Sequence, residues 1–201
     1  MTELRLPPLV LLGQPSLMRE QEPVDPERIQ ESEFQRLLRV LAQCMVHYQG
    51  IGIAAPQIGW NARVFCMGIE DDSERYPDAE PIPFEFWINP RVEPLGDAVN
   101  HAWEGCLSVP GMRGWVRRPA AIRISGLDAA GRETRSEKQG FAARVAQHEY
   151  DHLDGVLFPM RVSEPRWLVP DPVMAQQTEW QADWPSPGAR VTPSGALSEI
   201  A

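Results

Sequence analysis

Residues 147–152, Gln-His-Glu-Tyr-Asp-His, place two histidines four positions apart, with a glutamate directly after the first. On an α-helix, residues at this spacing lie one turn apart on the same face, and at about 1.5 Å rise per residue their Cα atoms are roughly 6 Å apart. His148 and His152 can therefore bind one metal ion. Glu149 lies beside that ion and can act on the water that it holds. The pattern predicts a metal-dependent hydrolase.

The sequence around the histidines predicts the helix that this spacing requires. A stripe at helical spacing carries apolar residues first and histidines last: Phe141, Val145, His148 and His152. Alanines, which favour helix, occupy several positions between them. Gly140 precedes the segment and Gly155 follows it, as is typical of the residues that punctuate a helix. We therefore expect a helix with one buried face, and we expect the second half of that face to form the metal site.

Two histidines leave a metal site incomplete, because a catalytic site normally has three protein ligands and one open position. His152 is the last histidine of the chain, so no third histidine follows. A protease of the thermolysin type would take a glutamate from a later helix, and Glu164 and Glu179 are the candidates. Both glutamates lie in proline-punctuated sequence without a clear helical frame.

Cys106 is the other candidate for the third ligand. It follows Gly105, and a Pro-Gly turn comes shortly after it, which predicts an exposed backbone at which a thiolate can face a metal. A lone cysteine is more often a small buried hydrophobic residue. We expect Cys44, on the apolar side of a helix, and Cys66, in a strand, to be of that kind.

A third block, residues 50–59, reads Gly-Ile-Gly-Ile-Ala-Ala-Pro-Gln-Ile-Gly. Its small residues let a substrate backbone approach closely, and it lacks the third glycine, the lysine and the preceding strand of nucleotide-binding loops. This block, the Trp-Glu-Gly-Cys-Leu-Ser segment of residues 103–108 and the Gln-His-Glu-Tyr-Asp-His segment occur in an order that resembles the peptide deformylase family. The resemblance covers roughly residues 8 to 163.

The resemblance implies removal of the N-formyl group from new polypeptides that begin with formyl-methionine, with release of formate. By this resemblance Cys106, His148 and His152 are the metal ligands, and Glu149 moves protons between the water and the leaving amine. The Gln57 side chain and the Leu107 backbone N–H would stabilise the oxyanion. The substrate would contact four further residues: Ile51, Gly52, Phe141 and Val145. Taken without the resemblance, the last two are more typical of a core.

The resemblance implies one divalent metal ion, and the family is associated with iron(II). Zinc, nickel and cobalt also suit two nitrogen ligands and one sulfur ligand. The partner would be a nascent formyl-methionine polypeptide. A contact with the ribosome is left open, and we expect a monomer.

Composition limits the partners and the cellular compartment that we expect for the protein. The formal net charge of −9 disfavours nonspecific binding to nucleic acid, and we expect no direct sequence-specific binding to it either. No apolar run approaches the ~20 residues of a membrane span, and the first residues lack the apolar core of a signal peptide. Three cysteines do not suggest a disulfide framework. These features predict a cytoplasmic protein without a membrane segment.

Two other classes of function stay open at this point. One is a zinc endopeptidase that uses Glu164 or Glu179 as its third ligand, and such a protein would keep its metal when Cys106 is replaced by alanine. The other is a deformylase-like binding protein that has lost activity. The second is disfavoured because every motif position is filled.

The chain predicts an α+β fold in which mixed or antiparallel sheets surround a central helix that carries the HExxH motif. We expect a helix from Pro26 to Gln49 capped by Asp25, strands near residues 63–67, 84–88 and 121–125, and a hairpin that returns at 133–135. Residues 1–164 would form the catalytic domain and residues 165–201 a proline-rich tail. That tail either packs on the domain through its tryptophans or is partly disordered, and residues 70–83 read as a surface insertion.

Several charged residues near the motifs also carry expectations. We expect Arg113, Arg117 and Arg118 to form a solvated strand edge and Arg144 to lie at the rim of the substrate pocket. Glu104 and Asp151 are candidates for orienting the ligands, and either could equally be a structural ion-pair partner.

Overall fold

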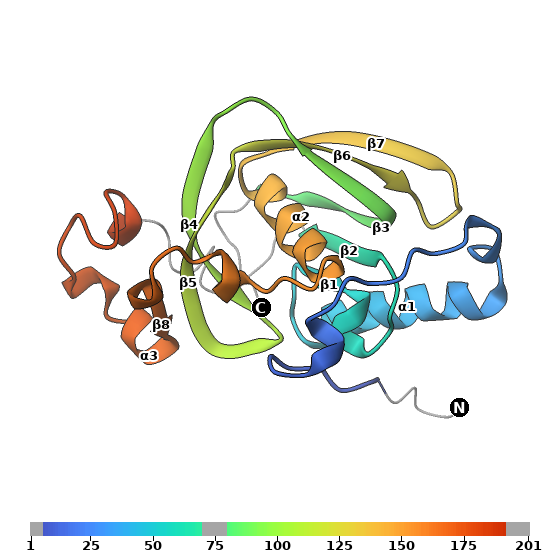
Figure 1. The fold of residues 1–201 in the computed structure, drawn as a ribbon, viewed down its shortest axis with the longest axis horizontal. Coiled ribbons are helices and arrows are strands. Elements are labelled where there is room, and N and C mark those ends of the chain that lie inside the picture. Colours follow the sequence, from blue (N-terminus) through green and yellow to red (C-terminus); the bar gives the residue numbers. More distant parts are fainter. Residues whose placement is uncertain (1–5, 70–79, 192–201) are drawn as a thin grey trace.

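A computed structural model gives the fold and describes residues 6–69 and 80–191. The expected α+β class is confirmed, with antiparallel sheets on either side of the central helix α2 (Gly140–Leu153) (Figure 1). One sheet has five strands in the order β1-β2-β3-β6-β7, and the other has three in the order β4-β5-β8. The strands are β1 (Gly52–Ala54), β2 (Val64–Ile69), β3 (Ile82–Pro94), β4 (Val99–Cys106), β5 (Val109–Pro119), β6 (Ala121–Leu127), β7 (Glu133–Gln139) and β8 (Leu168–Pro170).

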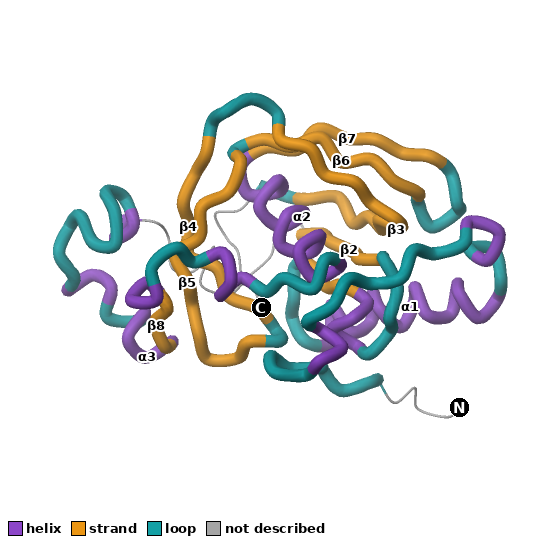
Figure 2. The backbone as a smooth tube through the Cα atoms, viewed as in Figure 1, coloured by secondary structure: helices purple, strands orange, loops and turns teal. Residues whose placement is uncertain are grey.

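Helical segments connect and flank the sheets (Figure 2). The other α-helices are α1 (Ser32–His47) and the one-turn α3 (Asp171–Met174). The 3-10 turns lie at Pro15–Leu17, Pro26–Arg28, Ala55–Ile58, Phe158–Arg161, Pro165–Trp167, Gln177–Glu179 and Ala189–Val191. No helix among the described residues is long and apolar enough to span a membrane.

Strand β2 shows how the five-stranded sheet buries both of its faces. Val64 and Cys66 belong to the apolar cluster formed with α1, whereas Phe65 and Met67 belong to the cluster formed with α2. Successive residues of a strand point to opposite faces of a sheet. A continuous apolar run therefore fits a strand that lies between two helices, and α2 is held on one of these buried faces.

The predicted helix of residues 26–49 is present but shorter, and its start was wrong. Asp25 caps a separate 3-10 turn by accepting a hydrogen bond from the Glu27 N–H (3.0 Å), and α1 begins only at Ser32. Glu31 has an extended backbone at the helix N-terminus (ψ 140°), so the chain bends between the two segments. The predicted strands and the β6–β7 hairpin are all present and continue past their expected last residues. However, β2 begins at Val64 rather than at residue 63, and β3 begins at Ile82, within the segment expected to be an insertion.

The proline-rich tail packs on the domain over its described part. Strand β8 pairs with β5, and Trp167, Trp180 and Trp184 pack against the β4–β5 strands. The expected insertion begins directly after β2, and its residues 70–79 lie outside the described residues.

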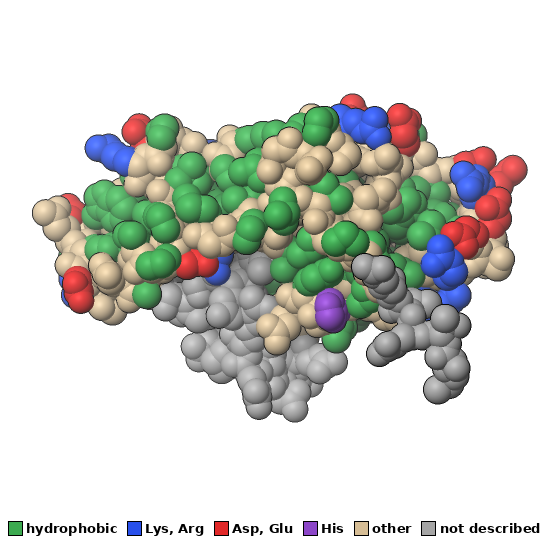
Figure 3. Space-filling model, turned by 90° about the horizontal axis from the view of Figure 1, so that it is seen from below, with side chains coloured by type: hydrophobic (Ala, Val, Ile, Leu, Met, Phe, Trp, Pro, Cys, Tyr) green, Lys and Arg blue, Asp and Glu red, His purple; other side chains and the backbone are tan. Residues whose placement is uncertain are grey.

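Apolar side chains also reach the surface. The view from below shows them across the middle of that face, with charged groups mainly toward its ends (Figure 3). Among the described residues, the large exposed apolar side chains are Leu11, Leu12, Met18, Val46, Phe84, Val99, Met160 and Val173. Most of a protein's accessible surface comes from apolar atoms, so this pattern by itself does not identify an interface.

Candidate metal centre

Three predicted ligands from two elements meet inside the protein. Cys106 ends β4, while His148 and His152 lie one turn apart on α2, and their ligand atoms all lie within 4.8 Å of one another. The Cys106 Sγ is 3.3 Å from the His152 Nε2. All three residues are buried. The structure thus brings together the sulfur and the two imidazoles that the sequence pointed to.

The geometry of the β4–β5 hairpin directs Cys106 toward α2. Glu104 pairs with Gly114 in regular register, but the register shifts before Cys106, which pairs with Val109. A shift of this kind is typical of a β-bulge, which re-aims side chains next to active sites. Only two residues, 107 and 108, separate the end of β4 from the start of β5.

Glu104 orients the first histidine. Its Oε2 lies 3.1 Å from the His148 Nδ1, so a proton on Nδ1 leaves Nε2 free as the ligand atom. Burial lowers the pKa of His148, but hydrogen bonds and charge from Cys106 and Glu104 outweigh it and raise that pKa well above its ordinary value. Positive charge is therefore favoured at this position, and a thiolate with two imidazoles is a donor set that suits a divalent metal ion.

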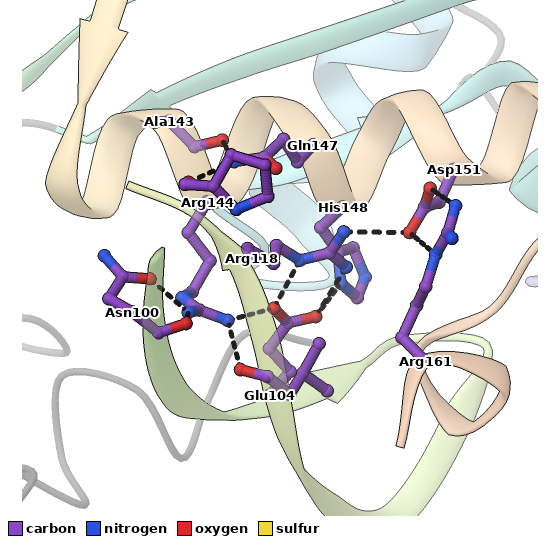
Figure 4. A network of polar contacts seen from close by, with 11 residues as sticks. Asn100, Glu104, Arg118, Ala143, Arg144, Gln147, His148, Asp151 and Arg161 are labelled. Atoms are coloured by element: carbon purple, nitrogen blue, oxygen red, sulfur yellow. Dashed lines mark hydrogen bonds and ion pairs between the residues drawn. The ribbon is translucent and has the colours of Figure 1, made fainter. Parts of the chain in front are cut away.

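A buried ionic network holds Glu104 in place (Figure 4). Arg118 donates from Nε and Nη2 to the two Glu104 oxygens at 2.6 and 2.8 Å, and Arg144 also pairs with Oε1. Burial raises the pKa of Glu104, yet the two arginines and His148 overcome this and hold it well below its ordinary value. Glu104 is therefore a carboxylate at neutral pH although its side chain is fully buried.

Asp151 extends the same network to the molecular surface. It accepts from Arg118 Nη1 at 2.9 Å and from Arg161 at 2.7 and 3.1 Å, and Arg161 is partly exposed. Removing one partner of a buried ion pair leaves an uncompensated charge, which costs about 3–5 kcal/mol. The network thus ties β4, β5 and α2 together behind the histidines.

The expectations for the arginines were partly wrong. Arg113 and Arg118 are buried rather than solvated, and only Arg117 of the three is exposed. Arg144 does not lie at a pocket rim. It is buried and donates to Glu104, to the Val116 carbonyl and to Asn100. The sequence shows the charge of these residues, but their burial depends on carboxylates that are distant in sequence.

Glu149 occupies the position expected of a proton carrier. It is buried, and its Oε2 has no hydrogen-bond partner among the described residues. Burial raises its pKa to about 7, against the opposing charges of His148 and Arg118. Such a value lets a carboxyl group accept and release a proton near neutral pH.

Gly52 provides the space that Glu149 occupies. A Cβ atom at this position would lie 2.4 Å from the Glu149 Oε1, a distance that real Cβ contacts do not reach. The glycine of the 50–59 block therefore sets where the carboxylate can lie.

Gln57 points its amide nitrogen into the same centre. Its Nε2 lies 3.6 Å from the Cys106 Sγ and 3.2 Å from the Ser108 Oγ. Its Oε1 accepts from the Ala54 N–H at 2.8 Å, which leaves the NH₂ group directed at the sulfur. Leu107 follows Cys106 directly and packs partly buried beside the cluster that includes α1.

The apolar residues expected at the substrate site lie together. Ile51 and Val145 are buried in one cluster, and Phe141 packs partly exposed against it. The endopeptidase ligands are not part of the centre, because Glu164 and Glu179 are both exposed and lie outside the ligand group found among the described residues. No sequence pattern points to Asn100 or Arg161, which join the network only through Arg144 and Asp151.

Comparisons with known proteins agree with this geometry. The family model described as "Polypeptide deformylase" matches residues 6–167. The chain is 46% identical over 156 residues to "Peptide deformylase 1" of Bordetella pertussis, covering 78% of this chain and 87% of that protein. It is 45% identical over 159 residues to "Peptide deformylase 1" of Nitrosomonas europaea, covering 79% and 89%.

Solved structures show the same likeness. A Met-Ala-Ser-bound class I type b peptide deformylase from Acinetobacter baumannii superposes with a TM-score of 0.74 and 32% identity, covering 79% of this chain and 99% of that one. A peptide deformylase from Synechococcus elongatus in complex with actinonin gives a TM-score of 0.70 and 34% identity, covering 82% and 83%.

Proposed function

This chain belongs to the peptide deformylase family, and from that premise we propose which of its residues carry the reaction. The protein is an enzyme that removes the N-formyl group from nascent polypeptides. We propose Cys106, His148 and His152 as the metal ligands and Glu149 as the residue that moves protons. One observation carries the proposal: the Cys106 sulfur and the two imidazoles lie close together inside the protein. Beside them lies the Glu149 Oε2, which has no hydrogen-bond partner among the described residues.

The residues of the centre divide the reaction between them. When bound, the divalent ion supplies Lewis-acid chemistry, which polarises the formyl carbonyl and makes water a nucleophile near neutral pH. Glu149 accepts a proton from the attacking water and delivers it to the amine nitrogen as the C–N bond breaks, so that formate and a free amino terminus leave. The Gln57 NH₂ and the Leu107 backbone N–H donate to the oxyanion of the tetrahedral intermediate.

We propose that the substrate lies against Ile51, Gly52, Phe141 and Val145. Ile51, Phe141 and Val145 belong to one apolar cluster on the α2 side of the sheet, which suits a methionine side chain. Gly52 lies beside Glu149 and has no side chain to obstruct an approaching backbone. We propose that the protein acts as a monomer in the cytoplasm and meets its substrate near the ribosome.

For the metal we propose iron(II). Two nitrogen ligands and one thiolate also accept zinc, nickel and cobalt. The experiment is anaerobic purification with metal analysis, then reconstitution of the same apoprotein with each ion and assay on a formyl-methionine peptide in aerated buffer. The iron form should be the most active and should lose activity over hours, while the nickel and cobalt forms persist. An iron form no more active than the zinc form contradicts the assignment of iron.

The assay also tests the reaction itself. A formyl-methionyl peptide and its acetyl counterpart differ only at the blocked amino terminus, so the acetyl peptide is the matched control. We expect formate and a free amino terminus from the first, and no free amino terminus from the second. Cleavage of an internal peptide bond in either substrate would restore the endopeptidase hypothesis.

A further inference from the structure

The tail is bound to the sheet that carries Cys106, although the family match ends at residue 167. Strand β8 pairs with β5 so that Leu168 lies opposite Gly114, and on its other side Gly114 lies opposite Glu104 of β4. Glu104, Gly114 and Leu168 therefore form one row across the three strands. The tail strand is one strand removed from the carboxylate that orients His148.

Aromatic side chains cover the outer face of this sheet. Five of the seven tryptophans belong to the cluster: Trp103, Trp115, Trp167, Trp180 and Trp184. The Trp103 ring lies 5.2 Å from Trp115 across the β4–β5 pair, and 5.7 Å and 6.3 Å from the tail's Trp180 and Trp184. Because successive residues of a strand point to opposite faces, Trp103 faces the tail and Glu104 faces α2. The tail thus packs directly behind the metal centre.

The tail also reaches the inner face. Leu168 packs against a buried cluster that contains Cys106 and Phe158. The Phe158 ring is stacked on the His148 ring, with 6.4 Å between the two ring centroids. The next residue, Val169, belongs to the tryptophan cluster on the outer face. One short strand therefore contributes apolar packing to both faces of the sheet.

These contacts matter because the ionic network joins the hairpin to α2 on one face only, and β4 and β5 have few other strand neighbours. Within the described residues, β8 is the only further strand in their sheet. An isolated two-stranded hairpin is marginally stable in water, and a third strand or a packed layer is needed. A metal centre requires its ligands within about 0.5 Å of their working positions. A loosely held hairpin would leave Cys106 and Glu104 without that precision.

We propose that the tail segment of residues 165–191 is a positioning element of the metal centre. By adding β8 and the tryptophan layer to the β4–β5 hairpin, it holds Cys106 and Glu104 against α2 in the arrangement that the ion needs. The proposal rests on the proposed role of Cys106 as a ligand. It adds that metal affinity depends on side chains that lie outside the centre and close to the end of the chain.

The test compares variants at two tryptophans of the full-length protein, each prepared without metal and then loaded with cobalt(II). Trp180→Ala removes an aromatic ring that packs on Trp103. Trp60→Ala is the matched control, since Trp60 is also half-buried and packs on one aromatic ring, Phe34, at 5.2 Å next to α1. For each variant one measures the unfolding midpoint, the cobalt(II) affinity in competition with a chelator, and the thiolate-to-cobalt absorption band. Trp180→Phe serves as the conservative rescue.

We expect both alanine variants to lose stability but only Trp180→Ala to bind cobalt(II) more weakly. The loss should be ~10-fold, the low end of the effect of removing a residue that orients a ligand, with a weakened thiolate band and recovery in Trp180→Phe. Equal cobalt(II) affinity in Trp180→Ala and Trp60→Ala, at similar losses of stability, would overturn the proposal. If Trp180→Ala does not fold, Trp184→Leu gives the same comparison. Absence of the thiolate band in the wild type would instead contradict the role of Cys106, independently of the tail.

Discussion

Helix α2 and the β4–β5 hairpin each contribute to one metal centre, but they do so in different ways. The helix brings His148, Glu149 and His152 together through its own periodicity, within five consecutive residues. The hairpin contributes Cys106 and Glu104, whose positions depend on a register shift, on two arginines and on the tail. One half of the centre is set locally, and the other is set by packing between distant segments.

The difference predicts how each half responds to substitution. Replacement of Glu149 on α2 should alter the chemistry and leave the architecture intact, because its Oε2 has no hydrogen-bond partner among the described residues. Changes on the hairpin should alter metal binding and stability together, because Glu104 and Cys106 are held by contacts that also stabilise the fold.

The largest effect should come from Cys106→Ala. With only two protein ligands, metal affinity should fall by more than the ~10–100-fold typical of losing a residue that merely orients a ligand. Metal content after dialysis against a weak chelator measures it. Cys44→Ala is the control, because Cys44 is buried in the α1 cluster away from the centre. A Cys106→Ala protein that keeps one equivalent of metal would place the third ligand elsewhere.

Glu149→Ala tests the helix half. Loss of the proposed proton carrier should lower turnover by ~10²–10⁴-fold, with the metal retained, because in our proposal Glu149 follows a ligand without being one. Turnover and metal content are measured on the same preparation. Glu164→Ala, which removes an exposed carboxylate, should change neither. Loss of metal from the Glu149 variant would show that this residue is a ligand.

Glu104→Gln tests the support of the hairpin half. The amide keeps the shape but removes the charge that Arg118, Arg144 and His148 face, so we expect a ~10–100-fold loss of metal affinity or activity together with lower stability. Glu137→Gln is the control, since Glu137 pairs with Arg123 at an exposed site. Equal behaviour of the two variants would mean that Glu104 does not orient His148.

Removal of residues 165–201 should have the smallest of these effects on the metal centre, a loss of metal affinity of ~10-fold, and a measurable effect on stability. The proline-rich sequence alone suggests that truncation near Glu164 leaves a folded, active enzyme, but the paired β8 strand and the tryptophan cluster change that expectation. We expect a lower melting temperature, by ~2–4 °C for each kcal/mol lost in a domain of this size. An unchanged melting temperature would show that the tail adds nothing to the hairpin.

Much of this could be predicted from sequence because the signals are local. The α2 helix, the glycine-rich block and the strands at 63–67, 84–88 and 121–125 each follow from a periodicity or a composition within a short window. Cys106 was harder, since Gly105 before it and the Pro-Gly turn after it fit a metal-facing thiolate but do not exclude a buried thiol, and the resemblance to a family motif selected it. Arg113, Arg118 and Arg144 were misplaced because burial of a charge depends on its partner.

The sequence by itself determined which reactive groups the protein has and how some of them are spaced. These are two imidazoles and a carboxylate at helical spacing, a cysteine in a tight turn, and glycines where the chain must leave space. Only the tertiary structure decided that Glu104 faces His148, that Arg118 and Arg144 neutralise it inside the protein, and that Gly52 makes room for Glu149. The packing of the tail on the β4–β5 hairpin was likewise decided only by the tertiary structure. Helical spacing acts over a few residues through backbone geometry, whereas ion pairing and side-chain packing join residues that only the folded chain brings together.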